Sequence, residues 1–135
     1  MKKILRILSI ILLFINGISG VAGGFGMIGD PSGRSLGWST DMLGPSPFEN
    51  FLVPGIFLFV GNGVMSIFIA VMTIKNRSHY ATFIVFQGLF LCSWIVIQMV
   101  MLQFYHFLHL ICGIIGVLLV VCGWYLLEYR KPAIL

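Results

Sequence analysis

Four long apolar runs dominate the sequence, and none of them contains Asp, Glu, Lys or Arg. A helix needs roughly 20 apolar residues to cross a hydrocarbon core about 30 Å thick. The runs therefore predict an all-α membrane protein, a four-transmembrane-helix bundle that forms one integral membrane domain over residues 1–135. The expected spans are residues 7–28, 51–74, 80–102 and 107–127.

With 59% hydrophobic and 9% charged residues, the composition excludes an ordinary soluble domain, which is typically about 25% charged. The lipid bilayer is the expected surrounding, and no nucleic-acid partner is expected because the basic residues are split into small groups beside the spans.

The last two spans have no Gly or Pro between them, so their separation follows from length. As one helix, residues 80–127 would extend roughly 72 Å at 1.5 Å per residue. Because this is more than twice the thickness of the hydrocarbon core, the chain must reverse. The polar cluster Gln103-Phe104-Tyr105-His106 is the predicted turn.

The basic residues predict the orientation of the spans. Positive residues favour the cytoplasmic side. Both termini are therefore expected in the cytoplasm, with an ordered loop, residues 29–50, outside. On the cytoplasmic side lie Lys2, Lys3, Arg6, Lys75, Arg77, Arg130 and Lys131, and only Arg34 lies outside.

The first run admits a second interpretation. Lys2 and Lys3, an apolar stretch and then Gly20-Val21-Ala22 resemble a secretory signal with a cleavage site between small residues. Cleavage would leave three spans. We expect this segment to be retained as the first span.

The second span is predicted to begin before its apolar run. Ser46-Pro47-Phe48-Glu49 has the pattern of a capping box with Pro at the first helical position. Pro54 would then lie about two turns into the helix and crowd the carbonyl of Asn50, which predicts a kink.

Small residues recur at helical spacing in the first and fourth spans. Such rows let helix backbones approach closely in lipid. They indicate packing within the bundle, or alternatively against another protein. The expected packing residues are Gly20, Gly24, Gly116 and Gly123.

Two groups of polar residues are candidate ligand-binding sites. Asn16 and Asn62 both fall near the bilayer midplane, where an Asn16–Asn62 hydrogen bond is expected to stabilise the packing of the two helices. The alternative is a polar site that binds or conducts a small molecule. Near the outer interface, two His at i, i+3 with nearby polar groups can bind a metal or relay a proton. That outer set contains Gln98, Gln103, His106, His109, Asp30 and Glu49.

Several function classes are excluded by what the sequence lacks. All four carboxylates lie in loops or at span ends, so a proton-coupled antiporter with a membrane-embedded acid is not expected. No metal-ligand spacing completes the His pair, and no nucleotide-binding, serine-hydrolase or zinc-protease motif occurs. We therefore predict no catalytic residue, no metal and no cofactor.

A set of short motifs resembles small, uncharacterised bacterial four-span membrane proteins. The resemblance covers the first two spans and their loop, implies a multi-pass protein of the bacterial inner membrane, and supplies no activity. The motifs are Gly23-Gly24, Gly29-Asp30-Pro31-Ser32-Gly33, Ser46-Pro47-Phe48, Phe51-Leu52-Val53-Pro54-Gly55 and Asn62-Gly63.

Three functional hypotheses follow. The first is a non-enzymatic accessory or structural subunit that packs against partner membrane proteins or against itself. The second is binding or translocation of a small molecule, lipid or ion at Asn16 and Asn62, or at His106 and His109. The third is an enzyme that modifies lipids in the outer leaflet, using one of these histidines with Asp30 or Glu49.

Overall fold

The computed structural model describes residues 2–34, 37, 49–102 and 107–130, and in this part of the chain the regular structure is helical. Four helical segments are long and apolar enough to cross a membrane. The chain is therefore an all-α, multi-pass membrane protein with four spans, as the sequence predicts. The elements are α1 (Lys2–Gly29), α2 (Leu52–Phe57), the π-helix η3 (Leu58–Val64), α3 (Met65–Ile74), α4 (Tyr80–Leu102) and α5 (Phe107–Arg130).

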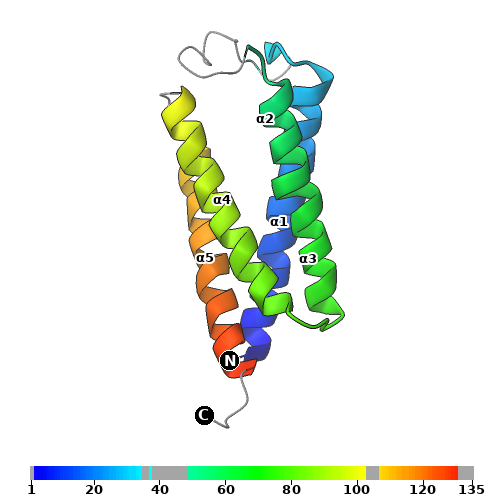
Figure 1. Cartoon of the computed structure of the whole chain (residues 1–135), viewed down its shortest axis with the longest axis vertical. Helices are drawn as coiled ribbons and strands as arrows, with labels where there is room; N and C mark the ends of the chain where they lie inside the picture. The colour runs from blue at the N-terminus through cyan, green and yellow to red at the C-terminus, as the bar shows by residue number, and fades with distance from the viewer. Residues whose placement is uncertain (1, 35–36, 38–48, 103–106, 131–135) are drawn as a thin grey trace.

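The helices are arranged as two antiparallel hairpins. α1 runs along the second span, which consists of α2, η3 and α3, and α4 runs along α5 (Figure 1). The first residues of α1 and the last of α5 lie at the same end of the molecule (Figure 1). The short connection from α3 to α4 lies at this end as well, so the two hairpins are joined there.

Close glycine contacts hold the first hairpin together. A Cβ atom built on Gly20 would lie 2.7 Å from the main-chain nitrogen of Gly63, and one on Gly24 would lie 2.6 Å from the Cβ of Phe59. No larger residue fits at either position without displacing the neighbouring helix. Packing at this distance stabilises helix pairs in lipid, where the hydrophobic effect does not drive association.

Close glycine contacts also hold the second hairpin together. A Cβ on Gly116 would lie 2.6 Å from the Sγ atom of Cys92, and one on Gly123 would lie 2.8 Å from the main-chain nitrogen of Val85. Gly88 of α4 lies in turn against the main-chain oxygen of Gly116. All four glycines expected in helix packing therefore lie in contacts between the chain's own helices.

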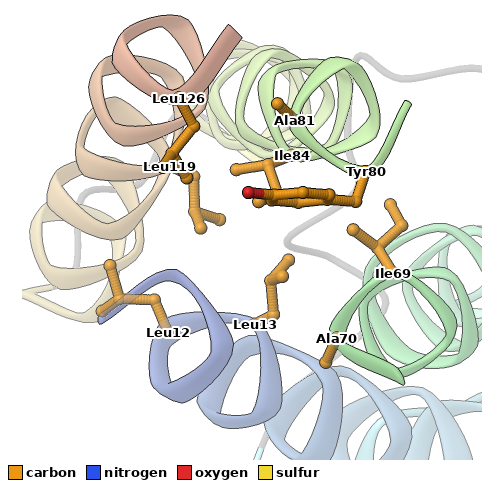
Figure 2. Packing of buried hydrophobic residues seen from close by; sticks show 9 residues of the cluster. All are labelled: Leu12, Leu13, Ile69, Ala70, Tyr80, Ala81, Ile84, Leu119 and Leu126. Atoms are coloured by element: carbon orange, nitrogen blue, oxygen red, sulfur yellow. The ribbon is translucent and has the colours of Figure 1, made fainter. Parts of the chain in front are cut away.

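An apolar core joins the two hairpins near the α3–α4 connection. Tyr80 and Ile84 of α4 point towards side chains from the other three spans (Figure 2). Leu13, Ile69 and Leu119 are fully buried there. The core consists of Leu12, Leu13, Ile69, Ala70, Tyr80, Ala81, Ile84, Leu119 and Leu126.

The end of α3 is capped by its own backbone and by Arg6. The Asn76 N–H donates to the Thr73 oxygen and the Arg77 N–H to the Met72 oxygen, with Asn76 in the left-handed region at φ 54°. This is a Schellman motif. The Arg6 guanidinium donates to the oxygens of Thr73 and Ile74, both at 3.1 Å. These bonds satisfy the carbonyl groups that a helix end leaves unpaired.

Large apolar side chains point outwards along all four spans. Ile18 and Phe25 of α1, Phe68 of α3, Val100 of α4 and Val121 of α5 are each more than half exposed. Exposure on this scale is expected only where lipid replaces water as the surrounding solvent. The bundle therefore contacts the lipid bilayer with these faces.

The start of the second span differs from the prediction. Glu49, Asn50 and Phe51 form bends and the helix begins at Leu52, so a helix continuous from Ser46 is wrong, although residues 46–48 lie outside the described part. The Asn50 side-chain oxygen accepts from the Leu52 N–H at 3.0 Å and replaces the expected capping box.

The predicted kink at Pro54 assumed that the helix starts at Ser46. Because α2 starts at Leu52, the expected cause of the kink is absent. Pro54 lies in the first turn of α2, where a helical residue has no hydrogen-bond partner within the helix for its N–H group. No helical hydrogen bond is lost there, and Asn50 lies outside the helix. The irregularity of this span is instead the π-helix that starts four residues later.

Candidate functional site

A π-helix interrupts the second span near its middle. η3 contains the sequence Gly61-Asn62-Gly63, and it is enclosed by α1 on one side and α4 on the other. In a π-helix each N–H bonds five residues back, and such turns occur frequently at functional sites. The turn is closely packed, because a Cβ on Gly61 would lie 2.5 Å from the ring of Phe90.

Asn16 of α1 binds to this segment. Its Nδ2 atom donates to the main-chain oxygen of Asn62 at 3.3 Å and to the Oγ atom of Ser66 at 2.7 Å. All three residues are buried. The expected Asn16–Asn62 hydrogen bond is present, but its acceptor is the backbone of Asn62, so the Asn62 side chain is left for another partner.

Gln87 of α4 approaches the same turn from the other hairpin. Its Nε2 atom donates to the Gly61 oxygen at 3.1 Å and to Asn62 Oδ1 at 3.4 Å. Gln87 and Asn62 are both 0% exposed. Together, Asn16, Asn62, Ser66 and Gln87 form what we call the polar cluster, which draws its members from three of the four spans.

Two amide atoms of the polar cluster have no hydrogen-bond partner among the described residues. These atoms are Nδ2 of Asn62, a donor, and Oε1 of Gln87, an acceptor. Reversing the Gln87 amide would place its oxygen against the Gly61 oxygen, and reversing the Asn62 amide would place its nitrogen against Gln87 Nε2. The observed orientations are therefore the favourable ones, and the unpaired donor and acceptor are properties of the arrangement.

A third unpaired donor lies further along α4. Trp94 is seven residues after Gln87 and hence on the same face of the helix. Its ring stacks on Phe57 with centroids 6.1 Å apart, and its buried Nε1 atom has no partner in the described part of the chain. Leu58, Leu91, Trp94 and Phe57 thus line the contact between the second span and α4, which we call the seam.

The outer group of candidate residues is only partly described. Gln98 and His109 are half-buried, and Glu49 is exposed. Asp30 accepts a hydrogen bond from Ser32 in a tight turn. Gln103 and His106 lie outside the described residues. Within the described ranges, no three His, Cys, Asp or Glu residues are grouped so that they could hold a metal ion.

His109 belongs instead to an apolar groove on the outward surface of α4 and α5. This groove has a volume of about 490 Å³ and is lined by carbon and sulfur atoms almost throughout. Gly113 lies on it, and a Cβ atom there would meet nothing within 4 Å.

Two members of the polar cluster, Gln87 and Ser66, were not candidates from the sequence. Gln87 carries the same signal as Asn16, an amide within a long apolar run, and polar groups inside a membrane are expected to be paired or functional. Ser66 follows Asn62 by four residues and so lies on the same helix face. Both signals are present in the sequence.

The chemistry available in the polar cluster is hydrogen bonding. It contains three amides and one hydroxyl, and it has no charged group, no titratable base and no thiol. The chain matches no protein family, no curated protein and no solved structure.

Proposed function

We propose that this protein is a non-enzymatic membrane protein that binds an uncharged polar group of a lipid-soluble molecule at the polar cluster. The observation that carries the proposal is the pair of unpartnered, fully buried atoms Asn62 Nδ2, on the π-helix η3, and Gln87 Oε1, on α4. This is the second of the three hypotheses, restricted to the midplane site.

The energetic argument concerns the unpaired groups. A buried polar group without a partner costs about 1–3 kcal/mol of stability. Apolar residues of similar size would avoid that loss at both positions. A bound molecule that pairs with both atoms offsets it, so the cluster is better suited to binding than to structural support alone.

The absence of charge in the polar cluster decides the kind of ligand. An ion in a buried site needs an opposite charge or a dense set of hydrogen bonds, because its desolvation costs several kcal/mol. Asn16, Asn62, Ser66 and Gln87 supply no charge. This supports a neutral ligand over ion translocation.

Two observations favour this proposal over the other hypotheses. The glycine rows that suggested a partner subunit contact the chain's own helices, so they provide no reason to expect another protein. Catalysis would need a base beside the Ser66 hydroxyl, and its described neighbour is the Asn16 amide, which does not take up protons at neutral pH.

The test is native mass spectrometry of the protein purified in lipid nanodiscs. We expect one co-purifying small molecule per chain in the unmodified protein, and its loss in Asn62→Leu and Gln87→Met. Gln98→Leu changes an amide on the same helix outside the polar cluster, so this control should keep the molecule.

Retention of the molecule by both cluster variants, or an empty unmodified protein, would contradict the proposal. Circular dichroism melting of each variant establishes that it is folded.

A further inference from the structure

We infer that the apolar groove between α4 and α5 binds one acyl chain of a membrane phospholipid, in the leaflet where α4 ends and α5 begins. The groove is separate from the polar cluster, because neither Asn62 nor Gln87 lines it. Its volume is about 490 Å³. Three observations support the assignment: the depth of the groove in the spans, its continuity with the lipid-facing surface, and the open space at Gly113.

The groove covers one half of the bilayer thickness. On α5 its lining runs from His109 to Leu118, the first half of that helix's 20-residue span. On α4 the lining runs from Cys92 to Met99, in the last half of the span. At 1.5 Å per residue, the stretch on α5 is about 14 Å long, and half of a hydrocarbon core is roughly 15 Å. An acyl chain reaches from the headgroup region to the midplane, so its depth matches that of the groove.

The groove is continuous with the surface that contacts lipid. Val96 of α4 and Leu110 and Val117 of α5 line it, and each of them is more than half exposed. The lining also includes Ile95, which is buried, so the groove reaches inwards to the packed part of α4. Because the groove faces the bilayer directly, a lipid chain occupies it without passing through the bundle.

Gly113 has space beside it that the chain's own helices do not fill. The other glycines of α4 and α5, Gly88, Gly116 and Gly123, lie in close contacts between these two helices, whereas a Cβ atom on Gly113 would meet nothing within 4 Å. Glycine destabilises a helix interior relative to alanine, and an unfilled gap also loses dispersion contacts. An acyl chain that lies against Gly113 supplies those contacts.

The extent of the groove favours an acyl chain over a helix of another protein. A partner helix crosses both leaflets and needs a face that continues along the whole span. Beyond Leu118, the next hollow on α5 is lined by α5 alone, and its lining includes Glu128 and Trp124, which is 58% exposed. The groove formed by two helices therefore ends near the midplane, where the chains of the two leaflets meet.

The lining shows that the chain of the phospholipid is recognised and the headgroup is not. None of the described residues that line the groove is Asp, Glu, Lys or Arg. His109, the polar residue of the lining, lies at the end of the groove nearest the start of the α5 span. Since lipid chains are as apolar as these side chains, retention of one chain depends on packing contacts.

Native mass spectrometry of the protein in nanodiscs of one synthetic phosphatidylcholine tests this inference. At a collision energy that removes loosely attached lipid, we expect the unmodified chain to keep one phosphatidylcholine. Gly113→Leu fills the groove from α5 and Val96→Phe narrows it from α4, so each should keep roughly tenfold less lipid, because an overpacked site excludes the chain. Ala22→Leu enlarges an exposed side chain of α1 outside the groove and should keep the lipid.

Two further comparisons sharpen the test. Nanodiscs of a phosphatidylglycerol with the same chains should give the same retention, because the headgroup is not recognised. Gln87→Met should also keep the phospholipid, so a failure of the proposed function leaves this inference standing. Circular dichroism melting establishes that each variant is folded.

Four results would overturn the inference. They are an unmodified protein without retained phospholipid, undiminished retention in both groove variants, retention that changes with the headgroup, and a dimer that Gly113→Leu dissociates. The last result would place a second copy of the chain in the groove.

Discussion

At the scale of single residues, Gly20 marks the closest approach between the first two spans. A methyl group there would clash with main-chain atoms of Gly63 and Asn62. Unlike a side chain, the main chain cannot relieve this clash by changing rotamer. We predict that Gly20→Ala lowers the free energy of unfolding by about 1–3 kcal/mol, the usual range for overpacking. Equilibrium unfolding in mixed lipid–detergent micelles measures this change.

Gly113 provides the matched control. It is also a glycine within a helical span, but a methyl group there meets open space. Gly113→Ala should leave stability unchanged or raise it by up to about 1 kcal/mol, since Ala favours helix more than Gly does. Equal losses for both variants would show that the contact at Gly63 does not stabilise the hairpin.

Individual residues also show what the sequence can and cannot predict about the site. Asn16 and Asn62 stand out because each is an amide in an apolar run, and antiparallel spans place them at one depth. The pairing of Gln87 with Asn62 could not be predicted in the same way. It depends on the rotation of α4 against the second span. This rotation is set by the packing of Gly61 against Phe90 and by core residues of the other spans, such as Leu13 and Leu119, which are far from Gln87 in sequence.

At the scale of elements, the π-helix allows a deletion experiment. A π-helix accommodates an extra residue relative to an α-helix, so we predict that deleting Gly61 converts η3 to α-helix while α2 and α3 keep their faces. The variant should fold with near-normal thermal stability. It should lose the co-purified ligand, because Asn62 would turn away from Gln87.

A deletion in the regular part of the same span is the control. Removing Ile67 from α3 rotates the following residues by about 100° and takes Ile69 and Ala70 out of the core. This variant should melt at a clearly lower temperature in circular dichroism. Similar melting temperatures for the two deletions would contradict the special role of η3.

Hydropathy predicts the boundaries of the spans, but it does not predict the helix geometry within them. Four apolar runs predict four helices, and the observed α1 extends beyond the predicted residues 7–28 because Lys2, Lys3 and Arg6 continue the helix past the apolar run. The π-helix has no comparable signal. It depends on Gly61 and Gly63 fitting against Phe90 and Gly20, and these contacts form only when the spans assemble.

At the scale of the whole molecule, the two hairpins are joined unequally along their length. Near the α3–α4 connection, nine core residues drawn from all four spans hold them together, and the Arg6 guanidinium of α1 lies 6.0 Å from the ring centroid of Tyr80 in α4. For α2 itself, the side-chain contact with α4 that the structure describes is the stack of Phe57, its last residue, on Trp94. Since rigid helix pairs move as units about such a junction, the hairpins are expected to open at the α2 end.

Spin labels at the two ends test this opening. After the three cysteines are replaced, one pair of labels is placed at Val53 and Val100 and a second at Ile74 and Phe83, all of them exposed positions. Double electron–electron resonance in nanodiscs should give a broader distance distribution for the first pair. Saturation with the co-purified molecule should narrow that distribution, because a ligand of the polar cluster contacts Asn62 of one hairpin and Gln87 of the other, and should leave the second pair unchanged. Equal widths at both ends would mean that the bundle is uniformly rigid, and the polar cluster would then have no route by which a ligand enters.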